Sequence, residues 1–312
     1  MRVLITGATG FAGRHLSDFA LSKKGVRVYG LVRRASDTLA LGVVPIRADL
    51  LSKKSMLAVL KKTRPDRIYH LAGQSSVARS WKQSKKTFNV NVGGTRALLE
   101  AARDIGSRAR ILVCGSADVY GASARRRGKI TEKFPLKPVS PYGVSKLAQD
   151  LLGFHYFSTY GLWVVRTRAF NHLGPGQRLS FVAPSFARQI ADIASGKQKP
   201  EIKVGSLAAV RDFTDVRDVV RAYWLALEKG AAGEVYNVCS GHPRRVSDIL
   251  EFYLRASSVK IQVSRDRLLM RASDMPRLVG DASKLTRVTR WKPRIRFEKT
   301  LRDLLNEVKG RK

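Results

Sequence analysis

Short apolar runs alternate with longer segments of helical periodicity along the first half of this chain. The runs are short and almost wholly apolar, so they predict strands buried on both faces of a sheet. They lie at residues 2–5, 26–32, 67–71, 110–114 and 162–167. Apolar positions recur with helical spacing in residues 91–105 and 142–160. Strands that alternate with helices predict a parallel, doubly wound α/β sheet.

The rhythm changes after residue 171. Residues 172–177 form a turn rich in Pro and Gly. Helical patterns follow at residues 181–195, 215–229, 244–256 and 297–308. Residues 234–239 have a strand pattern, and residues 200–209 are irregular with strand character. We interpret this part as a smaller α/β lobe that binds the substrate over the carboxyl edge of the sheet. The predicted domains are residues 1–172 with about 211–240, and about 173–210 with 241–312.

The charge of the chain is strongly basic. It has 59 Lys and Arg against 24 Asp and Glu, which gives a formal net charge of +35, and the basic residues are spread over the sequence. Such a surface attracts polyanions and phosphorylated substrates. No helix-turn-helix, zinc or RNA-binding motif accompanies the charge, so nucleic-acid binding is disfavoured. We interpret the charge mainly as a solvated basic surface.

The compartment is predicted from what the sequence contains. The two cysteines, Cys114 and Cys239, lie in apolar strand-like runs, which favours a reducing cytoplasm over a disulfide framework. The N-terminus leads directly into a strand without a signal-peptide pattern, and the apolar runs are too short to span a bilayer. The five histidines show no metal-ligand spacing, so we predict no metal.

A glycine-rich turn directly follows the first predicted strand. Gly7, Gly10 and Gly13 are spaced by three, with Phe11 and Ala12 between the last two. Glycine allows the backbone to turn tightly and approach a pyrophosphate, which the N-terminus of the next helix then holds. The turn therefore predicts a dinucleotide site in a Rossmann-type sheet.

The end of the second strand distinguishes between two cofactors. A carboxylate at this position would bind the adenosine ribose of NAD, whereas Arg33 and Arg34 occupy it here and the first acid is Asp37. Two guanidinium groups suit the 2′-phosphate of NADP. We predict NADP(H), with NAD(H) as the alternative. Further cofactor contacts are expected from residues after two later strands, namely Asp49, Leu50, Leu71, Ala72 and Gly73.

Ser116, Tyr142 and Lys146 are the candidate catalytic residues. Tyr142 and Lys146 are four residues apart, so they share one helix face. Because an ammonium group favours a phenolate, Lys146 is expected to lower the pKa of Tyr142 from its ordinary value of about 10. Ser116 ends a predicted strand at the carboxyl edge, where its hydroxyl would hold a substrate oxygen. The three groups predict transfer of a hydride and a proton at a carbonyl carbon.

With these motifs the chain resembles extended short-chain dehydrogenases/reductases that act on nucleotide sugars. The segments that carry the resemblance are residues 6–13, 49–50, 70–73 and 115–116 together with Asn91, Tyr142 and Lys146. Residues 168–177, 209–218 and 274–281 are similar to GDP-4-keto-6-deoxy-mannose reductases. The resemblance implies a cofactor role for Asn91, and a homodimer formed through residues 91–105 and 142–160.

The same resemblance implies a GDP-sugar substrate and the residues that bind it. Asn171, Arg211 and Arg271 are expected at the nucleotide diphosphate, and Asp274 at the nucleotide ribose; guanidinium groups are suited to the diphosphate. The whole predicted substrate set is Ser116, Ala117, Asp118, Tyr142, Asn171, Val182, Arg211, Arg271 and Asp274.

Ala117 and Asp118 distinguish between the reactions that such a scaffold performs. In the related 4,6-dehydratases a Glu, sometimes preceded by an Asp, follows the Ser or Thr and expels water. Here the first acid is absent and the second is one methylene shorter, which disfavours dehydration. We predict an NADPH-dependent reductase of the C4 ketone of GDP-4-keto-6-deoxy-mannose, with GDP-rhamnose as the first product to test. The alternatives are a GDP-mannose 4,6-dehydratase, another nucleotide-sugar epimerase or dehydratase, and a nucleic-acid-binding protein with a vestigial enzyme site.

Overall fold

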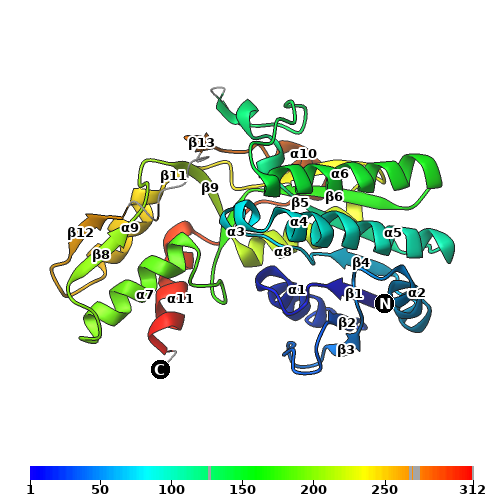
Figure 1. Cartoon of the computed structure of the whole chain (residues 1–312), viewed down its shortest axis with the longest axis horizontal. Coiled ribbons are helices and arrows are strands. Elements are labelled where there is room, and N and C mark those ends of the chain that lie inside the picture. The colour runs from blue at the N-terminus through cyan, green and yellow to red at the C-terminus, as the bar shows by residue number, and fades with distance from the viewer. Residues whose placement is uncertain (126–127, 267–268, 270–274, 311–312) are drawn as a thin grey trace.

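Two lobes lie side by side in the computed structural model of the 312-residue chain (Figure 1). The structure describes residues 1–125, 128–266, 269 and 275–310. The larger lobe contains a seven-stranded sheet in the order β10-β6-β5-β4-β1-β2-β3, in which every pairing is parallel. The strands are β1 (Arg2–Thr6), β2 (Arg27–Val32), β3 (Val44–Arg47), β4 (Arg67–His70), β5 (Arg110–Ser116), β6 (Val164–Ala169) and β10 (Val235–Val238). The predicted doubly wound α/β class is confirmed.

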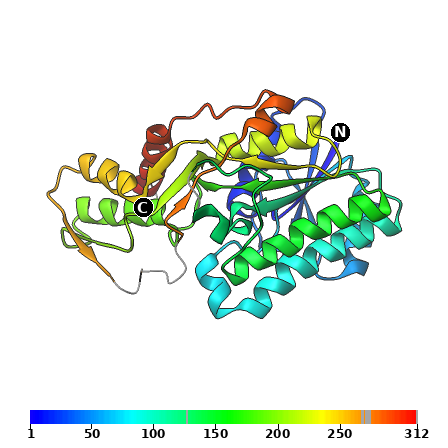
Figure 2. The same cartoon turned by 90° about the horizontal axis from the view of Figure 1, so that it is seen from above.

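Helices cover both faces of this sheet. On one face α1 (Phe11–Leu21) packs beside α8 (Val216–Lys229), and on the other α5 (Gly94–Asp104) lies between α2 (Lys53–Thr63) and α6 (Pro141–Tyr160). Figure 2 shows α5 and α6 running side by side along the outside of the lobe. The two apolar layers between sheet and helices form separate buried clusters. Burial of this apolar surface provides the main stabilisation of the lobe.

Local sequence signals fix the boundaries of α6. Ser140 accepts the main-chain N–H of Gly143 at 3.0 Å, Pro141 occupies the first turn, and Gly161 ends the helix in the left-handed region with φ 68°. Side-chain N-caps, an early proline and a C-terminal glycine are the usual terminators. The N-terminal part of the predicted helix 91–105 differs from expectation, since residues Asn89–Gly93 form a π-helical turn before α5.

The smaller lobe is built from three helices and a two-stranded sheet. They are α7 (Val182–Ala194), α9 (Val246–Arg255), α11 (Phe297–Gly310), β8 (Glu201–Val204) and β12 (Gln262–Arg265). The three helices and β8 share their own buried cluster, in which Ile190, Ile249 and Leu304 are almost completely inaccessible. The strand β8 lies inside the stretch for which only irregular strand character was expected.

A third sheet lies at the junction of the lobes. It contains β7 (Asn171–Leu173), β9 (Val210–Asp215), β11 (Pro243–Arg245) and β13 (Arg277–Leu278), with β9 paired to the other three. These short pairings are long-range, and the sequence pattern did not predict them as strands. Short helical elements complete the chain: α3 (Val77–Lys82), α4 (Ser84–Phe88), α10 (Ser283–Thr289) and two 3-10 turns at Ala117–Val119 and Ala122–Arg125.

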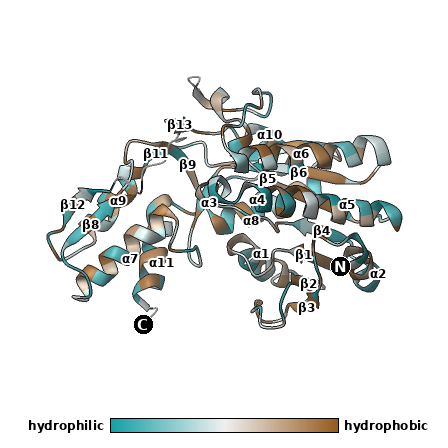
Figure 3. Ribbon diagram, in the orientation of Figure 1, coloured by the Kyte–Doolittle hydropathy of each residue, from teal (hydrophilic) through white to brown (hydrophobic). Residues whose placement is uncertain are grey.

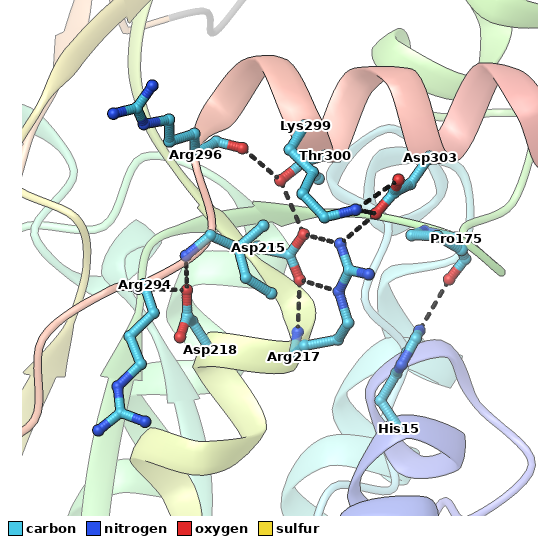
Figure 4. A network of polar contacts seen from close by, with 11 residues as sticks. His15, Pro175, Asp215, Arg217, Asp218, Arg294, Arg296, Lys299, Thr300 and Asp303 are labelled. Atoms are coloured by element: carbon cyan, nitrogen blue, oxygen red, sulfur yellow. Dashed lines mark hydrogen bonds and ion pairs between the residues drawn. The ribbon is translucent and has the colours of Figure 1, made fainter.

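A polar network joins α8 of the large lobe to α11 of the small lobe (Figure 4). The carboxylate of Asp215, which caps α8, accepts two hydrogen bonds from the Arg217 guanidinium and one from the Thr300 hydroxyl at 2.7 Å. Arg217 also donates to Asp303 at 2.8 Å. Because Asp215 is buried, these partners compensate a charge that would otherwise be costly.

One segment packs differently from the predicted domain division. Leu285 of α10 and the following Trp291 are fully buried in the cluster between the large sheet and α8. Residues 283–291 therefore pack with the large lobe, although they lie in the range assigned to the small one. The physical reason is that these apolar side chains find their buried neighbours on α8. The remaining division stays a prediction.

Candidate active site

The glycine turn and the segment after β4 come together at the carboxyl edge of the sheet. Gly7 has φ 76°, and a Cβ built on it would lie 2.7 Å from the main-chain nitrogen of Ala72. A Cβ on Gly13 would lie 2.0 Å from the Gly7 carbonyl oxygen. Both positions therefore require glycine, and they create a side-chain-free cradle at the N-terminus of α1, as a pyrophosphate site needs.

Phe11 fixes the outer side of this turn. It and Ala12 are half-buried at the start of α1, and the Phe11 ring stacks on His172 with centroids 5.8 Å apart. The neighbouring His15 contacts the Pro175 carbonyl oxygen through Nε2 at 2.8 Å. The glycine turn is thus held against the Pro/Gly-rich loop that follows β7.

Gly73 and Asn91 meet beside the candidate catalytic lysine. A Cβ on Gly73 would lie 2.8 Å from Asn91 Oδ1 and 3.8 Å from Lys146 Nζ. Asn91 is fully buried in the π-helical turn, accepts the main-chain N–H of Gln74 at 2.7 Å and donates to Ser145 Oγ at 2.9 Å. The segment that contains the predicted cofactor residues Leu71, Ala72 and Gly73 is therefore connected to α6 by the hydrogen bonds of Asn91.

The end of β2 presents two exposed guanidinium groups. Arg33 and Arg34 are exposed, and their main-chain N–H groups both donate to Asp37 Oδ2 at 2.9 Å. These two bonds lower the pKa of Asp37 below its ordinary value. The carboxylate is thus engaged with its own loop, while the two cationic side chains remain accessible to a phosphate.

Asp49 and Leu50 follow the end of β3 at the same edge. The Asp49 carboxylate accepts the main-chain N–H of Leu51 at 3.0 Å, and its side chain is exposed. Leu50 is half-buried and packs close to Gly94, where a Cβ would lie 2.8 Å from a Leu50 methyl group. Asp49 is placed where it can contact a ligand, whereas Leu50 also has a packing role.

Ser116 is the last residue of β5, and its hydroxyl is paired with Asp118. Ser116 Oγ donates to Asp118 Oδ2 at 3.1 Å and accepts the main-chain N–H of Asp118 at 3.2 Å. Ser116 is nearly buried, with 7% of its surface exposed, and Ala117 beneath it is fully buried. The pair presents a hydroxyl and a carboxylate together at the carboxyl edge.

Tyr142 lies on the first turn of α6, next to Ser116. Its main-chain N–H donates to Ser80 Oγ at 3.1 Å, which fixes the start of the helix. Burial raises the pKa of the Tyr142 phenol, the Asp118 carboxylate raises it further, and hydrogen bonding with Ser116 acts in the opposite direction. The expected lowering of this pKa by Lys146 is therefore wrong in its net direction, because desolvation of the phenolate dominates.

Lys146 reaches from α6 to β5. Its ammonium group donates to the Cys114 carbonyl oxygen at 2.8 Å and to Gln149 Oε1 at 2.7 Å. Burial lowers the pKa of Lys146. The sequence indicated Lys146 but not Gln149, although the spacing of three on one helix face is a usable signal.

A buried histidine supports this edge of the sheet. His70 Nδ1 lies 2.8 Å from Thr6 Oγ1, and His70 Nε2 lies 2.9 Å from Thr95 Oγ1, which itself donates to the Asn91 carbonyl oxygen. Because the Thr95 proton is used on Asn91, Nε2 is the protonated nitrogen of His70. Burial, together with the Lys146 charge, lowers the pKa of His70 to about 3, so the ring stays neutral and structural.

Three of the predicted substrate residues lie at the junction of the lobes. Asn171 is exposed on β7, and Val182 is the half-buried first residue of α7. Arg211 lies on β9, two positions before Phe213, which is the register partner of Asn171. Arg211 Nη1 donates to the Met275 carbonyl oxygen at 2.7 Å. Arg271 and Asp274 lie outside the described residues. The described residues contain no cluster of metal-ligating side chains.

Two further observations bear on the class of protein. Within the described residues, no helix has the length and apolar character that crossing a membrane requires. Cys114 and Cys239 are both free thiols.

Comparisons with known proteins give a consistent picture. Residues 4–304 match the family described as GDP-mannose 4,6 dehydratase. The chain is 37% identical to GDP-6-deoxy-D-mannose reductase of Pseudomonas aeruginosa, over 99% of this chain and 98% of that protein. It is 32% identical to GDP-mannose 4,6 dehydratase 2 of Arabidopsis thaliana, over 97% and 86%. The solved structure of RMD from Pseudomonas aeruginosa complexed with NADPH is similar with a TM-score of 0.88, 36% identity and 99% coverage of both chains.

Proposed function

This chain belongs to the GDP-mannose 4,6-dehydratase family of extended short-chain dehydrogenases/reductases, and we propose that it is an NADPH-dependent reductase of GDP-4-keto-6-deoxy-mannose. The family resemblance predicted from the motifs is thereby confirmed. The proposed product is a GDP-6-deoxyhexose, with GDP-rhamnose as the first candidate. The full-length similarity to a GDP-6-deoxy-D-mannose reductase supports this choice of substrate.

The observation that carries the proposal is the position of Tyr142, whose phenol lies on the first turn of α6 within hydrogen-bond reach of Ser116. A phenol holds its proton at neutral pH even at its ordinary pKa of about 10, and burial and the Asp118 carboxylate raise the pKa of Tyr142 further. A protonated phenol beside the Ser116 hydroxyl suits a ketone, whose oxygen must gain a proton as the carbon is reduced. The proposed catalytic residues are Ser116, Tyr142 and Lys146.

The residues at the carboxyl edge fit a nicotinamide dinucleotide. Gly7 and Gly13 leave a cradle that side chains would fill, and Gly73 adjoins Lys146 on the inner side. Arg33 and Arg34 would bind the 2′-phosphate of NADP(H), which we prefer over NAD(H). The similar structure with NADPH supports this preference. Asp49, Leu50, Leu71, Ala72 and Asn91 complete the proposed cofactor set.

Each catalytic residue has a distinct role in the proposed reduction. NADPH, when bound, supplies the hydride to C4 of the sugar. Ser116 would orient the C4 oxygen by turning its single hydroxyl proton from Asp118 Oδ2 to that oxygen, and Tyr142 would give the oxygen its proton. Lys146 lies one helical turn after Tyr142 on α6, and its buried positive charge would favour the phenolate left after proton transfer.

The substrate is proposed to lie between the lobes. Asn171 and Arg211 occupy adjacent strands of the junction sheet, and Val182 begins the first helix of the small lobe. With Arg271 and Asp274 they form the proposed site for the nucleotide diphosphate and ribose. A guanidinium at this position provides the charge that a diphosphate requires.

Dehydration of GDP-mannose is the second candidate, because the family match includes dehydratases. Asp118 is the acid available for it, and its Oδ2 accepts the Ser116 hydroxyl. The missing acid at Ala117 and the shorter side chain at Asp118 favour the reductase.

We also propose a cytoplasmic homodimer formed through α5 and α6. The outer face of α6 exposes Val144, Leu151 and Phe154, with 41%, 53% and 44% of their surfaces accessible. Figure 3 shows brown, hydrophobic stretches along this helix. Sedimentation of the purified protein measures the oligomeric state.

Product analysis distinguishes the candidate reactions. The reductase consumes one NADPH for each GDP-4-keto-6-deoxy-mannose and gives a GDP-6-deoxyhexose by NMR. A dehydratase instead converts GDP-mannose to the ketone with no net change in NADPH. A salt-dependent shift assay with duplex DNA and RNA tests the nucleic-acid alternative: strong binding without any turnover would favour it.

A further inference from the structure

We propose that Gln149 is a positioning residue that holds the ammonium group of Lys146 for the reaction. This inference rests on the proposed reductase function, in which Lys146 acts beside Tyr142. The two residues are three positions apart on α6, and Gln149 Oε1 accepts from Lys146 Nζ at 2.7 Å. Gln149 is fully buried, and 6% of the surface of Lys146 is exposed.

The hydrogen bonds of Lys146 are made to neutral groups. An ammonium has three N–H donors and no acceptor. Two of its donors go to the Cys114 carbonyl and the Gln149 amide, at 2.8 and 2.7 Å. Within the described part of the chain, Lys146 forms no ion pair with a carboxylate. Two fixed acceptors therefore set the direction of the third donor.

The neighbouring Asp150 shows how this helix treats a buried charge elsewhere. Its carboxylate is paired with two guanidinium groups, those of Arg166 and Arg168, the latter at 2.7 Å. Such a pair neutralises the charge and fixes it in place. Lys146 is different, because dipoles hold it while its positive charge remains uncompensated and available to the phenol and to a ligand.

The cost to Gln149 also argues for a functional role. The Lys146 ammonium group can only donate hydrogen bonds, so the Gln149 amide must turn its oxygen, Oε1, toward it. This orientation also fixes the direction in which the amide nitrogen, Nε2, points. Nε2 is buried and has no hydrogen-bond partner among the described residues. A buried unpaired donor is unfavourable, and an apolar side chain would avoid it at a purely structural position. The amide is therefore explained by what its oxygen does for Lys146.

Substitutions at Gln149 should change the ionisation of Lys146 in opposite directions. Gln149→Leu removes an acceptor that stabilises the charged form, so the pKa of Lys146 falls. Gln149→Glu places a carboxylate there, so the pKa of Lys146 rises. A residue that only fills space would not lower the pKa of Lys146 when Leu replaces it, so the downward shift in Gln149→Leu is the readout. The upward shift in Gln149→Glu serves as the positive control that position 149 acts on the ammonium group.

The test measures the NADPH dissociation constant by fluorescence titration from pH 6 to 10, followed by kcat for the ketone. In Gln149→Leu we expect NADPH binding to be about tenfold weaker at alkaline pH, and the pH above which binding weakens (its alkaline limb) to lie about one pH unit lower. We also expect kcat for the ketone to be reduced about 10- to 100-fold. In Gln149→Glu the alkaline limb of NADPH binding should move to higher pH. Gln189→Leu, on α7 where the amide bonds the main chain of Lys203 in β8, is the matched control and should leave the pH dependence of NADPH binding unchanged.

An unchanged pH dependence of NADPH binding in Gln149→Leu would overturn the proposal, even if its thermal stability fell. If Gln149→Leu does not fold, Gln149→Met, which is also uncharged and lacks the amide oxygen, decides in its place. Because NADPH binding is measured without substrate, a wild type that binds NADPH but does not reduce the ketone disproves the proposed function and leaves this test intact. A wild type that does not bind NADPH overturns both.

Discussion

The hydroxyl of Ser116 and the carboxylate of Asp118 hold each other, since Ser116 Oγ donates to Asp118 Oδ2 at 3.1 Å and receives the Asp118 main-chain N–H at 3.2 Å. The carboxylate that a dehydratase would use is thus coupled to the hydroxyl that we propose orients the ketone oxygen. It also acts on Tyr142, because its charge opposes formation of the phenolate. This relationship makes Asp118 a determinant of the proton donor.

Replacing Asp118 should therefore change the pH profile. In Asp118→Asn the repulsion is removed, so the pKa of Tyr142 falls and the alkaline limb of kcat moves to lower pH. The rate near neutral pH should fall less than tenfold, since the amide still accepts the Ser116 proton. Steady-state kinetics between pH 6 and 11 measures this, and the variant should lose activity at a pH where the wild type, with its raised Tyr142 pKa, is still active. An upward movement of the alkaline limb would contradict the assignment.

Tyr142→Phe removes the proton donor while it keeps the packing of α6. We expect kcat to fall about 10²- to 10⁴-fold, with NADPH affinity nearly unchanged. Stopped-flow measurement of NADPH oxidation gives the rate, and fluorescence titration gives the affinity. Full activity in this variant would exclude Tyr142 as the acid.

Gly13→Ala should damage the cofactor cradle. The added methyl group would lie 2.0 Å from the Gly7 carbonyl oxygen, so the turn must move. We expect a loss of about 1–3 kcal/mol in the free energy of unfolding and a strong decrease in NADPH affinity. Gly310→Ala, where a Cβ meets nothing within 4 Å, is the matched control. Normal NADPH binding by Gly13→Ala would show that the turn is not the site.

The double variant Arg33→Ala/Arg34→Ala tests the cofactor preference. Loss of two exposed guanidinium groups should weaken NADPH binding about tenfold or more and leave NADH binding nearly unchanged. The ratio of the two dissociation constants is the measurement. Arg302→Ala, a change of one exposed cation on α11, controls for the general basic charge. An equal loss for both cofactors would contradict a 2′-phosphate contact.

Arg217→Met should weaken the link between the lobes in Figure 4. It leaves the buried Asp215 carboxylate without its guanidinium, so we expect about 3–5 kcal/mol lower unfolding free energy at pH 7. Urea unfolding followed by tryptophan fluorescence measures this. Thr300→Val, which removes only the neutral hydroxyl partner, should cost less. An equal loss in the two variants would contradict the charge argument.

Acid should selectively weaken the same link. Burial opposes ionisation of Asp303, but its bonds from Lys299 and Arg217 outweigh that effect, and its pKa lies below the ordinary value. A depressed carboxyl pKa contributes stability above the unfolded pKa, and this contribution is lost as the pH falls through the folded pKa. The difference in unfolding free energy between wild type and Arg217→Met should therefore be the same at pH 7 and 5 and should decrease at pH 3 and below, because the pKa of Asp303 lies under its ordinary value of 3.8. A constant difference over this range would exclude Asp303 from the effect.

The sequence predicted the parts of the site that depend on local chemistry. Gly7 and Gly13 are required by a turn whose geometry the backbone itself imposes, and Tyr142 and Lys146 share a face because of helix periodicity. The buried strands were recognised because a sheet covered on both faces needs continuous apolar runs. The junction strands β7, β9 and β13 lack such runs, so the pattern did not indicate them.

What the sequence determined by itself is the α/β class and the glycine cradle, together with the choice of Ser116, Tyr142 and Lys146 as candidate reactive groups, because spacing and residue type carry that information. Only the tertiary structure decided how those groups are tuned. Desolvation raises the pKa of Tyr142 and lowers that of Lys146. The partners Asp118 and Gln149 act through distances that no linear pattern states. The physical reason is that burial and hydrogen-bond geometry arise from long-range packing, which exists only once β5 and α6 lie together.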